Sequence, residues 1–264
     1  MPLKVIDVND WLKGRNRVLI MGPPNSGKSY SLMSMPRPVH VLSCPGEKGW
    51  ATIKPDPDNG IHLYAFVEEP GPKKSGETVR EVKQLIYDLM SNKKGPVASL
   101  AVDGLHKFYE YLIDVAAGGA YFTGDDFEAF AYGVAQREVA AFLTLLSTSD
   151  IENVAITTWD GLEKDKAGQS ADKTVLRNSP SHVWPDLPGK AAKRIVGEFT
   201  ATVYATARAG RMTAQGATKE RVWQLLPDDE VWGIGLKVPR GVVVPKYIPQ
   251  AWDSLMAVLD GGAK

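Results

Sequence analysis

The stretch GPPNSGKS at Gly22–Ser29, directly after the apolar run VLIM at Val18–Met21, decides the fold of this chain. Its spacing is G-x-x-x-x-G-K-[ST], that of the phosphate-binding P-loop that joins a strand to a helix. The backbone N–H groups of such a loop converge on phosphates, Lys28 adds a point charge at the β and γ oxygens, and Ser29 offers a hydroxyl to Mg²⁺. The motif predicts a site for a nucleoside triphosphate and Mg²⁺.

The residues around the motif fit the strand–loop–helix setting that a P-loop requires. Pro23 and Pro24 have no N–H, but they lie early in the loop, so the later N–H donors remain available. A helix-compatible run follows at 29–35 and ends before Pro36. Tyr30 either stacks on the nucleotide base or packs in the core beneath this helix. The predicted nucleotide-binding residues are Gly22, Pro23, Pro24, Asn25, Ser26, Gly27, Lys28, Ser29 and Tyr30.

Composition limits the partners and the compartment. With 264 residues, 44% of them hydrophobic, the chain predicts a single domain over 1–264, with a lead-in at 1–14 and a tail at 260–264. The 31 basic and 31 acidic residues cancel, which excludes a global attraction to nucleic acid or to an anionic membrane. The single cysteine, Cys44, cannot form an internal disulfide, and no apolar run is long enough to span a bilayer. We therefore expect a cytoplasmic protein without membrane association.

The order of apolar runs predicts an α/β fold with a mostly parallel twisted sheet flanked by helices. Strands are expected at 38–43, 61–67, 97–103 and 153–158, and helices at 77–90 and 127–146. Three further β runs, at 200–207, 221–226 and 232–238, follow without long helices between them and predict a C-terminal antiparallel extension. A short helix at 249–259 closes the chain.

Asp103 is the strongest candidate for the metal partner of Ser29. It ends the buried run Val97–Val102, and parallel strands place such ends at the edge of the sheet where the P-loop lies. In P-loop proteins an acid at this place, the Walker B residue, helps to hold Mg²⁺. The alternative is that Asp103 caps the helix that begins near Gly104.

Together these elements resemble a RecA-like ATPase, in particular the compact phage-encoded ATPases of the single-strand-annealing and recombination group. The resemblance spans about 15–258 in element order and rests on the P-loop, on the strand that ends at Asp103, on the turn Gly46–Gly49 and on the tract Pro185–Lys190. Gly104 stands where a second acid would follow Asp103, which favours the RecA-like branch over AAA+. The resemblance implies Mg²⁺-dependent ATP hydrolysis in a ring or filament of identical subunits.

The resemblance also assigns roles to other residues. Glu47, after the second strand, matches the glutamate that activates water, although it is equally compatible with a solvated turn. Thr157 and Thr158 stand where the family carries a polar γ-phosphate sensor, and Trp159 beside them departs from its pattern. Lys237 and Arg240 match cations that act on a neighbouring subunit; the alternative is that both are solvated.

Single-stranded DNA, or a single-strand-binding protein, is the partner that the resemblance implies. The contacts would come from loops at 116–126 and at 161–190, and we expect the second loop to be mobile. If the chain is phage-encoded, its compartment would be the host cytoplasm. Nearby acids almost cancel the charge of these loops, so an ATP-driven motor or switch with a protein partner is a second hypothesis, and a P-loop kinase a weaker third. The candidate DNA-binding cations are Lys164, Lys166, Lys173 and Arg177.

Overall fold

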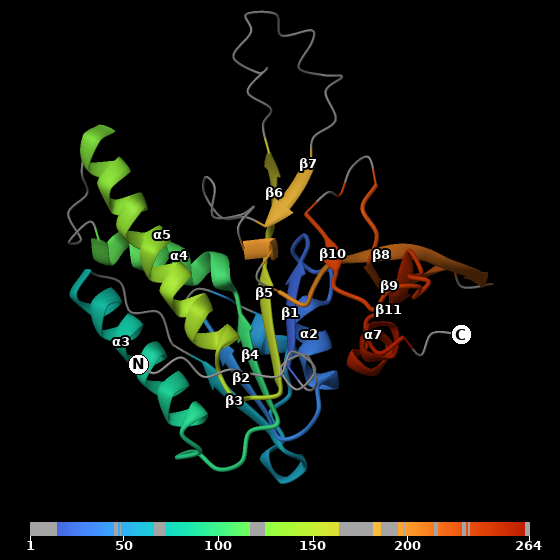
Figure 1. The fold of residues 1–264 in the computed structure, drawn as a ribbon, viewed down its shortest axis with the longest axis horizontal. Helices are drawn as coiled ribbons and strands as arrows, with labels where there is room; N and C mark the ends of the chain where they lie inside the picture. Colours follow the sequence, from blue (N-terminus) through green and yellow to red (C-terminus); the bar gives the residue numbers. More distant parts are fainter. Residues whose placement is uncertain are drawn as a thin grey trace, which may run out of the picture.

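The computed structural model describes residues 15–44, 47, 49–65, 72–116, 125–163, 182–185, 195–197, 199–213, 216–228, 231 and 233–261. Its frame is one large sheet with the strand order β11-β9-β8-β1-β5-β4-β2-β3, to which β10 adds by pairing with β8 (Figure 1). The strands are β1 (Asn16–Met21), β2 (Val39–Ser43), β3 (Ile61–Ala65), β4 (Ser99–Asp103), β5 (Asn153–Thr158), β8 (Ala201–Thr213), β9 (Gly216–Gln224), β10 (Gly235–Leu236) and β11 (Tyr247–Pro249).

The centre of the sheet is parallel, as the sequence predicts. The P-loop strand β1 pairs in parallel with β5 on one side and with β8 on the other. Strands β5, β4, β2 and β3 continue the parallel arrangement to the far edge. Parallel strands place their carboxyl ends at one edge, so the P-loop after β1, Asp103 at the end of β4 and the turn after β2 come together. This edge carries the site.

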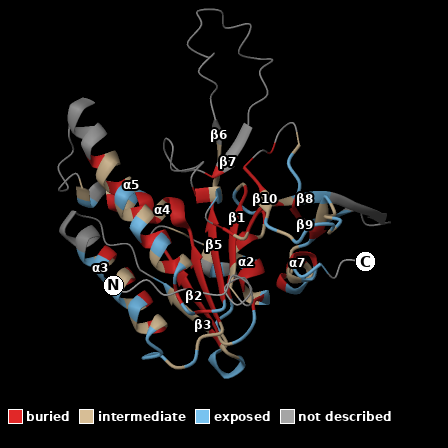
Figure 2. Cartoon of the chain, viewed as in Figure 1, coloured by how far each residue is buried: buried red, intermediate tan, exposed pale blue. Residues whose placement is uncertain are grey.

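Helices cover both faces of the sheet. They are α2 (Lys28–Ser31), α3 (Pro72–Met90), α4 (Leu105–Ala116), α5 (Asp125–Ser147) and α7 (Trp252–Leu259), with short 3₁₀ turns η1 (Leu32–Ser34), η2 (Gly49–Thr52) and η3 (Pro57–Asn59). Along β1 the side chains alternate: Leu19 packs into the core under α3, α4 and α5, whereas Ile20 packs into the core with Trp223 and Trp252 (Figure 2). Each such side chain removed from water contributes about 1.5–3 kcal/mol.

The C-terminal extension is antiparallel, but it begins inside the parallel sheet. Strand β8 pairs in parallel with β1 and in antiparallel fashion with β9, which in turn pairs with β11. Of the strand predicted at 232–238, the described residues contain only Gly235–Leu236, since glycines at 233 and 235 weaken a strand and Pro239 cannot donate a ladder hydrogen bond. The helix after the P-loop is also shorter than predicted and becomes η1 after Ser31.

A second, two-stranded sheet forms an antiparallel hairpin of β6 (Asp160–Glu163) and β7 (His182–Pro185), which stands out from the body of the molecule (Figure 1). Part of the segment predicted as a mobile loop, 161–190, is therefore strand. The four candidate DNA-binding cations lie outside the described residues, as do 1–14, 117–124 and 262–264. Among the helices that the structure describes, none is long and apolar enough to cross a membrane.

Candidate nucleotide-binding site

The P-loop positions Lys28 at the centre of the site. Asn25 and Gly27 have positive φ angles of 64° and 97°, which turn the loop into the start of α2. The Lys28 ammonium donates to the carbonyls of Gly22 at 2.7 Å and of Pro23 at 2.8 Å. Burial lowers the pKa of Lys28, while Asp103, Asp160 and Glu47 act in the opposite direction. The loop thus holds a cation among carboxylates.

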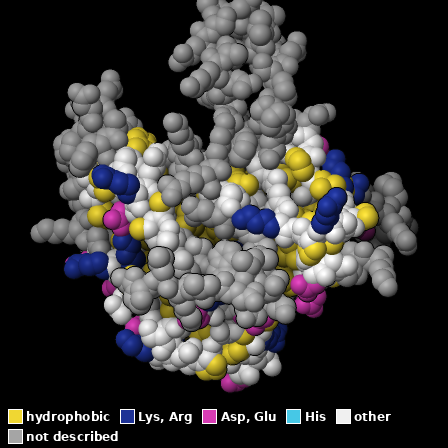
Figure 3. All heavy atoms as spheres, in the orientation of Figure 1, with side chains coloured by type: hydrophobic (Ala, Val, Ile, Leu, Met, Phe, Trp, Pro, Cys, Tyr) yellow, Lys and Arg dark blue, Asp and Glu magenta, His cyan; other side chains and the backbone are white. Residues whose placement is uncertain are grey.

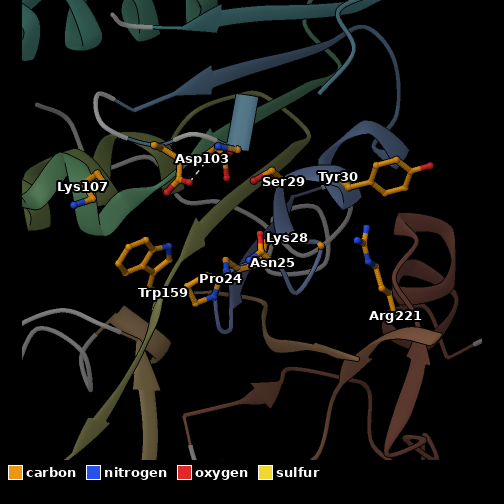
Figure 4. Close-up of a pocket in the computed structure, with 12 residues that line it drawn as sticks. Pro24, Asn25, Lys28, Ser29, Tyr30, Asp103, Lys107, Trp159 and Arg221 are labelled. Atoms are coloured by element: carbon orange, nitrogen blue, oxygen red, sulfur yellow. Dashed lines mark hydrogen bonds between the residues drawn. The ribbon is translucent and has the colours of Figure 1, made fainter. Parts of the chain in front are cut away.

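A pocket of about 450 Å³ opens over this loop, within the range of small-molecule sites (Figure 4). Asp103, Lys107 and Trp159 lie at one end of it, and Tyr30 and Arg221 lie at the other, with the P-loop between them. The residues that line the pocket are Pro24, Asn25, Gly27, Lys28, Ser29, Tyr30, Glu47, Gly49, Asp103, Lys107, Trp159 and Arg221.

Asp103 is fully buried at the carboxyl end of β4, with 1% of its surface exposed. Its Oδ1 accepts a hydrogen bond of 2.5 Å from Thr157 Oγ1 on the neighbouring strand β5. Thr157 Oγ1 in turn accepts from the N–H of Gly104 at 2.9 Å. Burial, and to a lesser degree Glu47, raises the pKa of Asp103 to about 6, against the effects of Thr157, Ser29 and Lys28. The carboxyl group is therefore bonded across the sheet and ionises just below neutral pH.

Ser29 and Asp103 fit a divalent cation. A Cβ placed on Gly49 would come within 2.2 Å of Ser29 Oγ and within 2.5 Å of Asp103 Oδ2, so both oxygens face one small space that only a glycine leaves open. Hydroxyl and carboxylate oxygens are ligands that Mg²⁺ prefers. This convergence favours the metal-binding interpretation of Asp103 over the helix cap.

Glu47 folds back onto the same site. Its Oε1 accepts from the N–H of Gly49 at 3.2 Å, and it lines the pocket with Lys28 and Asp103. Gly104 permits this approach, because at its φ of 93° an added Cβ would come within 2.9 Å of Glu47 Cβ. Glu47 Oε2 lies 3.6 Å from Nε2 of the buried His106. Burial, followed by Lys107 and Lys28, lowers the pKa of His106 to about 3, so this contact joins a carboxylate to a neutral ring.

Comparison with protein families identifies the family of the chain. A family model described as an AAA domain matches residues 15–233, which is most of the chain and contains every residue that lines the pocket. The chain belongs to the AAA domain family. Members are P-loop ATPases, so nucleotide binding and ATPase activity, usually with Mg²⁺, are the general properties that membership indicates. A search of curated proteins finds no match.

Several residues of this AAA domain site escape sequence reasoning. The His106 ring stacks on Trp159, with centroids 4.2 Å apart, and Lys107 Nζ lies 5.4 Å from the centre of the Trp159 ring. Lys107 also donates to Glu110 at 2.7 Å. Lys107 lies in the first turn of α4, four residues after Asp103, and this position is a signal that could have identified it. Arg221 carries no such signal, because it reaches the P-loop from β9.

Of the remaining predicted residues, Tyr30 lines the pocket, whereas Thr158, Lys237 and Arg240 do not. Tyr30 is 57% exposed, so it does not pack in the core. Thr158 is fully buried and is not among the residues that line the pocket. Lys237 donates to the carbonyl of Gly197 at 2.7 Å, and both Lys237 and Arg240 are exposed outside this pocket.

Proposed function

We propose that this chain binds ATP with Mg²⁺ and hydrolyses it, with Glu47 as the group that activates water. The observation that carries the proposal is that Lys28, Asp103 and Glu47, from three separate segments, line one pocket. Lys28 supplies positive charge to the β and γ phosphate oxygens. Ser29 and Asp103 would hold Mg²⁺, which when bound neutralises charge that develops on the phosphates.

Glu47 is suited to receive a proton. Its Oε1 is oriented by the N–H of Gly49, and Oε2 faces His106, which is neutral and forms no ion pair with it. In the reaction the water oxygen forms a bond to the γ-phosphorus, the bond from that phosphorus to the β–γ bridging oxygen breaks, and the water proton passes to Glu47. The products are ADP and inorganic phosphate.

The test is the steady-state release of phosphate from ATP with and without Mg²⁺. Lys28→Ala should lose nucleotide binding, whereas Glu47→Gln should bind ATP and lose turnover by about 10²-fold or more. Lys94→Ala and Glu81→Gln, which change exposed residues of the same types, are the matched controls. Wild-type protein without Mg²⁺-dependent turnover would contradict the proposal.

The narrower part of the proposal is a RecA-like oligomer of the phage recombination and replication type that acts on single-stranded DNA. Its support is the β6–β7 hairpin, which begins at Asp160, directly after the pocket residue Trp159. Tyr204 donates to Asp160 Oδ2 at 2.9 Å and ties the base of this hairpin to β8. A nucleotide in the pocket would contact Trp159, and a partner bound to the hairpin would contact the strand that begins at the next residue, Asp160.

Charge distribution supports the alternative, a protein partner. The chain has no net charge, and basic and acidic described side chains are interspersed on the face drawn in Figure 3. ATP hydrolysis with and without single-stranded DNA, at two salt concentrations, separates the two. Stimulation that falls with salt, and that is lost when Lys164, Lys166, Lys173 and Arg177 are neutralised, supports DNA. Hydrolysis indifferent to DNA supports a protein partner.

A further inference from the structure

The pocket is longer than the phosphate site, and its ends differ in chemistry. Ser29 Oγ and Asp103 Oδ2 face the same small space, which places the metal and the terminal phosphates at the end with Asp103. A nucleotide that begins there and follows the P-loop must direct its sugar and base toward the opposite end. That end is lined by Tyr30 and Arg221 (Figure 4).

Tyr30 presents an aromatic ring to this end of the pocket. It follows Ser29 on α2, where Lys28 and Ser31 are buried while the Tyr30 side chain remains 57% exposed. The guanidinium carbon of Arg221 lies 6.0 Å from the centre of the Tyr30 ring. Both groups are planar and stack on aromatic rings, and stacking of this kind tolerates any base.

Gln250 fixes the backbone of Arg221 beside the P-loop. The backbone N–H of Gln250 donates to the backbone carbonyl of Arg221 at 3.4 Å. Gln250 Nε2 donates to the carbonyl of Ser26 in the P-loop and to that of Val222 in β9, each at 3.0 Å. These bonds attach β9 to the P-loop, and Arg221 Cδ would lie 2.8 Å from a Cβ on Gly27. The position of Arg221 beside the loop is therefore built into the C-terminal extension.

We propose that Tyr30 and Arg221 form the base-binding end of the pocket, with the nucleobase between the phenol ring and the guanidinium. This inference rests on the proposed nucleotide site and adds its base-binding residues. Two layers of contact at about 3.5 Å each require a separation of about 7 Å. The guanidinium carbon now lies 6.0 Å from the centre of the Tyr30 ring, closer than two such layers allow, so the exposed arginine side chain must rotate outward to admit a base.

The experiment compares two ligands that share the phosphates and differ in the base. Dissociation constants of ATP and of inorganic tripolyphosphate, each with Mg²⁺, are measured for wild type, Tyr30→Ala and Arg221→Ala. Either substitution should weaken ATP about tenfold and leave tripolyphosphate within about twofold of wild type. Tyr30→Phe should retain ATP affinity, and Lys28→Ala should lose both ligands.

Matched controls come from α3. Tyr87 is 50% exposed and Arg80 is exposed, and neither lines this pocket, so Tyr87→Ala and Arg80→Ala should leave both dissociation constants unchanged. Unchanged ATP affinity in Tyr30→Ala and Arg221→Ala would overturn the inference, as would an equal loss of both ligands, which would make these residues phosphate ligands. If wild type bound no ATP, the proposed function itself would fail.

Discussion

Asp103→Asn should stabilise the protein in the absence of Mg²⁺ and nucleotide while it removes Mg²⁺-dependent activity. Burial, with Glu47, raises the pKa of Asp103 from 3.8 to about 6, so above pH 6 the folded protein holds an ionised carboxylate that would be more favourable in the unfolded chain. At 1.36 kcal/mol for each pKa unit, the difference is up to about 3 kcal/mol. An asparagine has no charge to bury, and its oxygen can still accept the Thr157 hydroxyl.

The sign of the pH dependence follows from the raised pKa. Between about pH 4 and pH 6 the folded state binds more protons than the unfolded state. The free energy of unfolding of the wild type therefore falls as pH rises through that window. The free energy of unfolding of wild type and of Asp103→Asn is measured by urea unfolding at pH 4.5 and pH 7.5 in EDTA. Asp58→Asn, which changes an exposed aspartate, is the control. The gain of Asp103→Asn should be greatest at pH 7.5. A variant less stable than wild type at that pH would refute the reasoning.

Two further substitutions test the supports of the site. Thr157→Val removes the 2.5 Å hydrogen bond to Asp103 and should raise the Mg²⁺ concentration for half-maximal ATPase about tenfold. The control is Thr202→Val, at a buried position of β8, which should leave this Mg²⁺ concentration unchanged. If Thr157→Val and wild type required the same Mg²⁺ concentration, the bond would have no role in holding the metal. Arg17→Met removes the donors to the carbonyls of Ser149 and Glu152, at 2.8 and 3.0 Å, and should lower the free energy of unfolding by about 1–3 kcal/mol, because the Ser149 carbonyl loses this donor. Urea unfolding with Arg80→Met as the control checks it, and a loss below about 1 kcal/mol would contradict it.

The parts of the site that sequence predicts are those encoded in short contiguous patterns. The P-loop spacing identifies the residues through Ser29, and the apolar run before Asp103 identifies the end of a buried parallel strand. Glu47 is predicted only through the resemblance, because its turn must fold back onto the site, and Gly104 is the residue that allows this.

At the base-binding end of the pocket, the sequence offers base stacking as one of two roles for Tyr30, but it does not predict Arg221. Arg221 meets Tyr30 only because β8 and β9 form an antiparallel pair and Gln250 attaches β9 to the P-loop. The bond from Gln250 to the carbonyl of Ser26 joins residues 224 apart in the sequence, and no local periodicity encodes it. The stacking of His106 on Trp159 is similar, since it depends on how α4 lies against the end of β5.

Single-turnover hydrolysis of labelled ATP by excess protein with Mg²⁺, for wild type and Glu47→Gln, tests the central claim most directly. We predict that wild type converts bound ATP to ADP and phosphate, whereas Glu47→Gln binds ATP and retains it unhydrolysed. Hydrolysis by Glu47→Gln at the wild-type rate would contradict the role of Glu47, and failure of wild type to hydrolyse bound ATP would contradict the account as a whole.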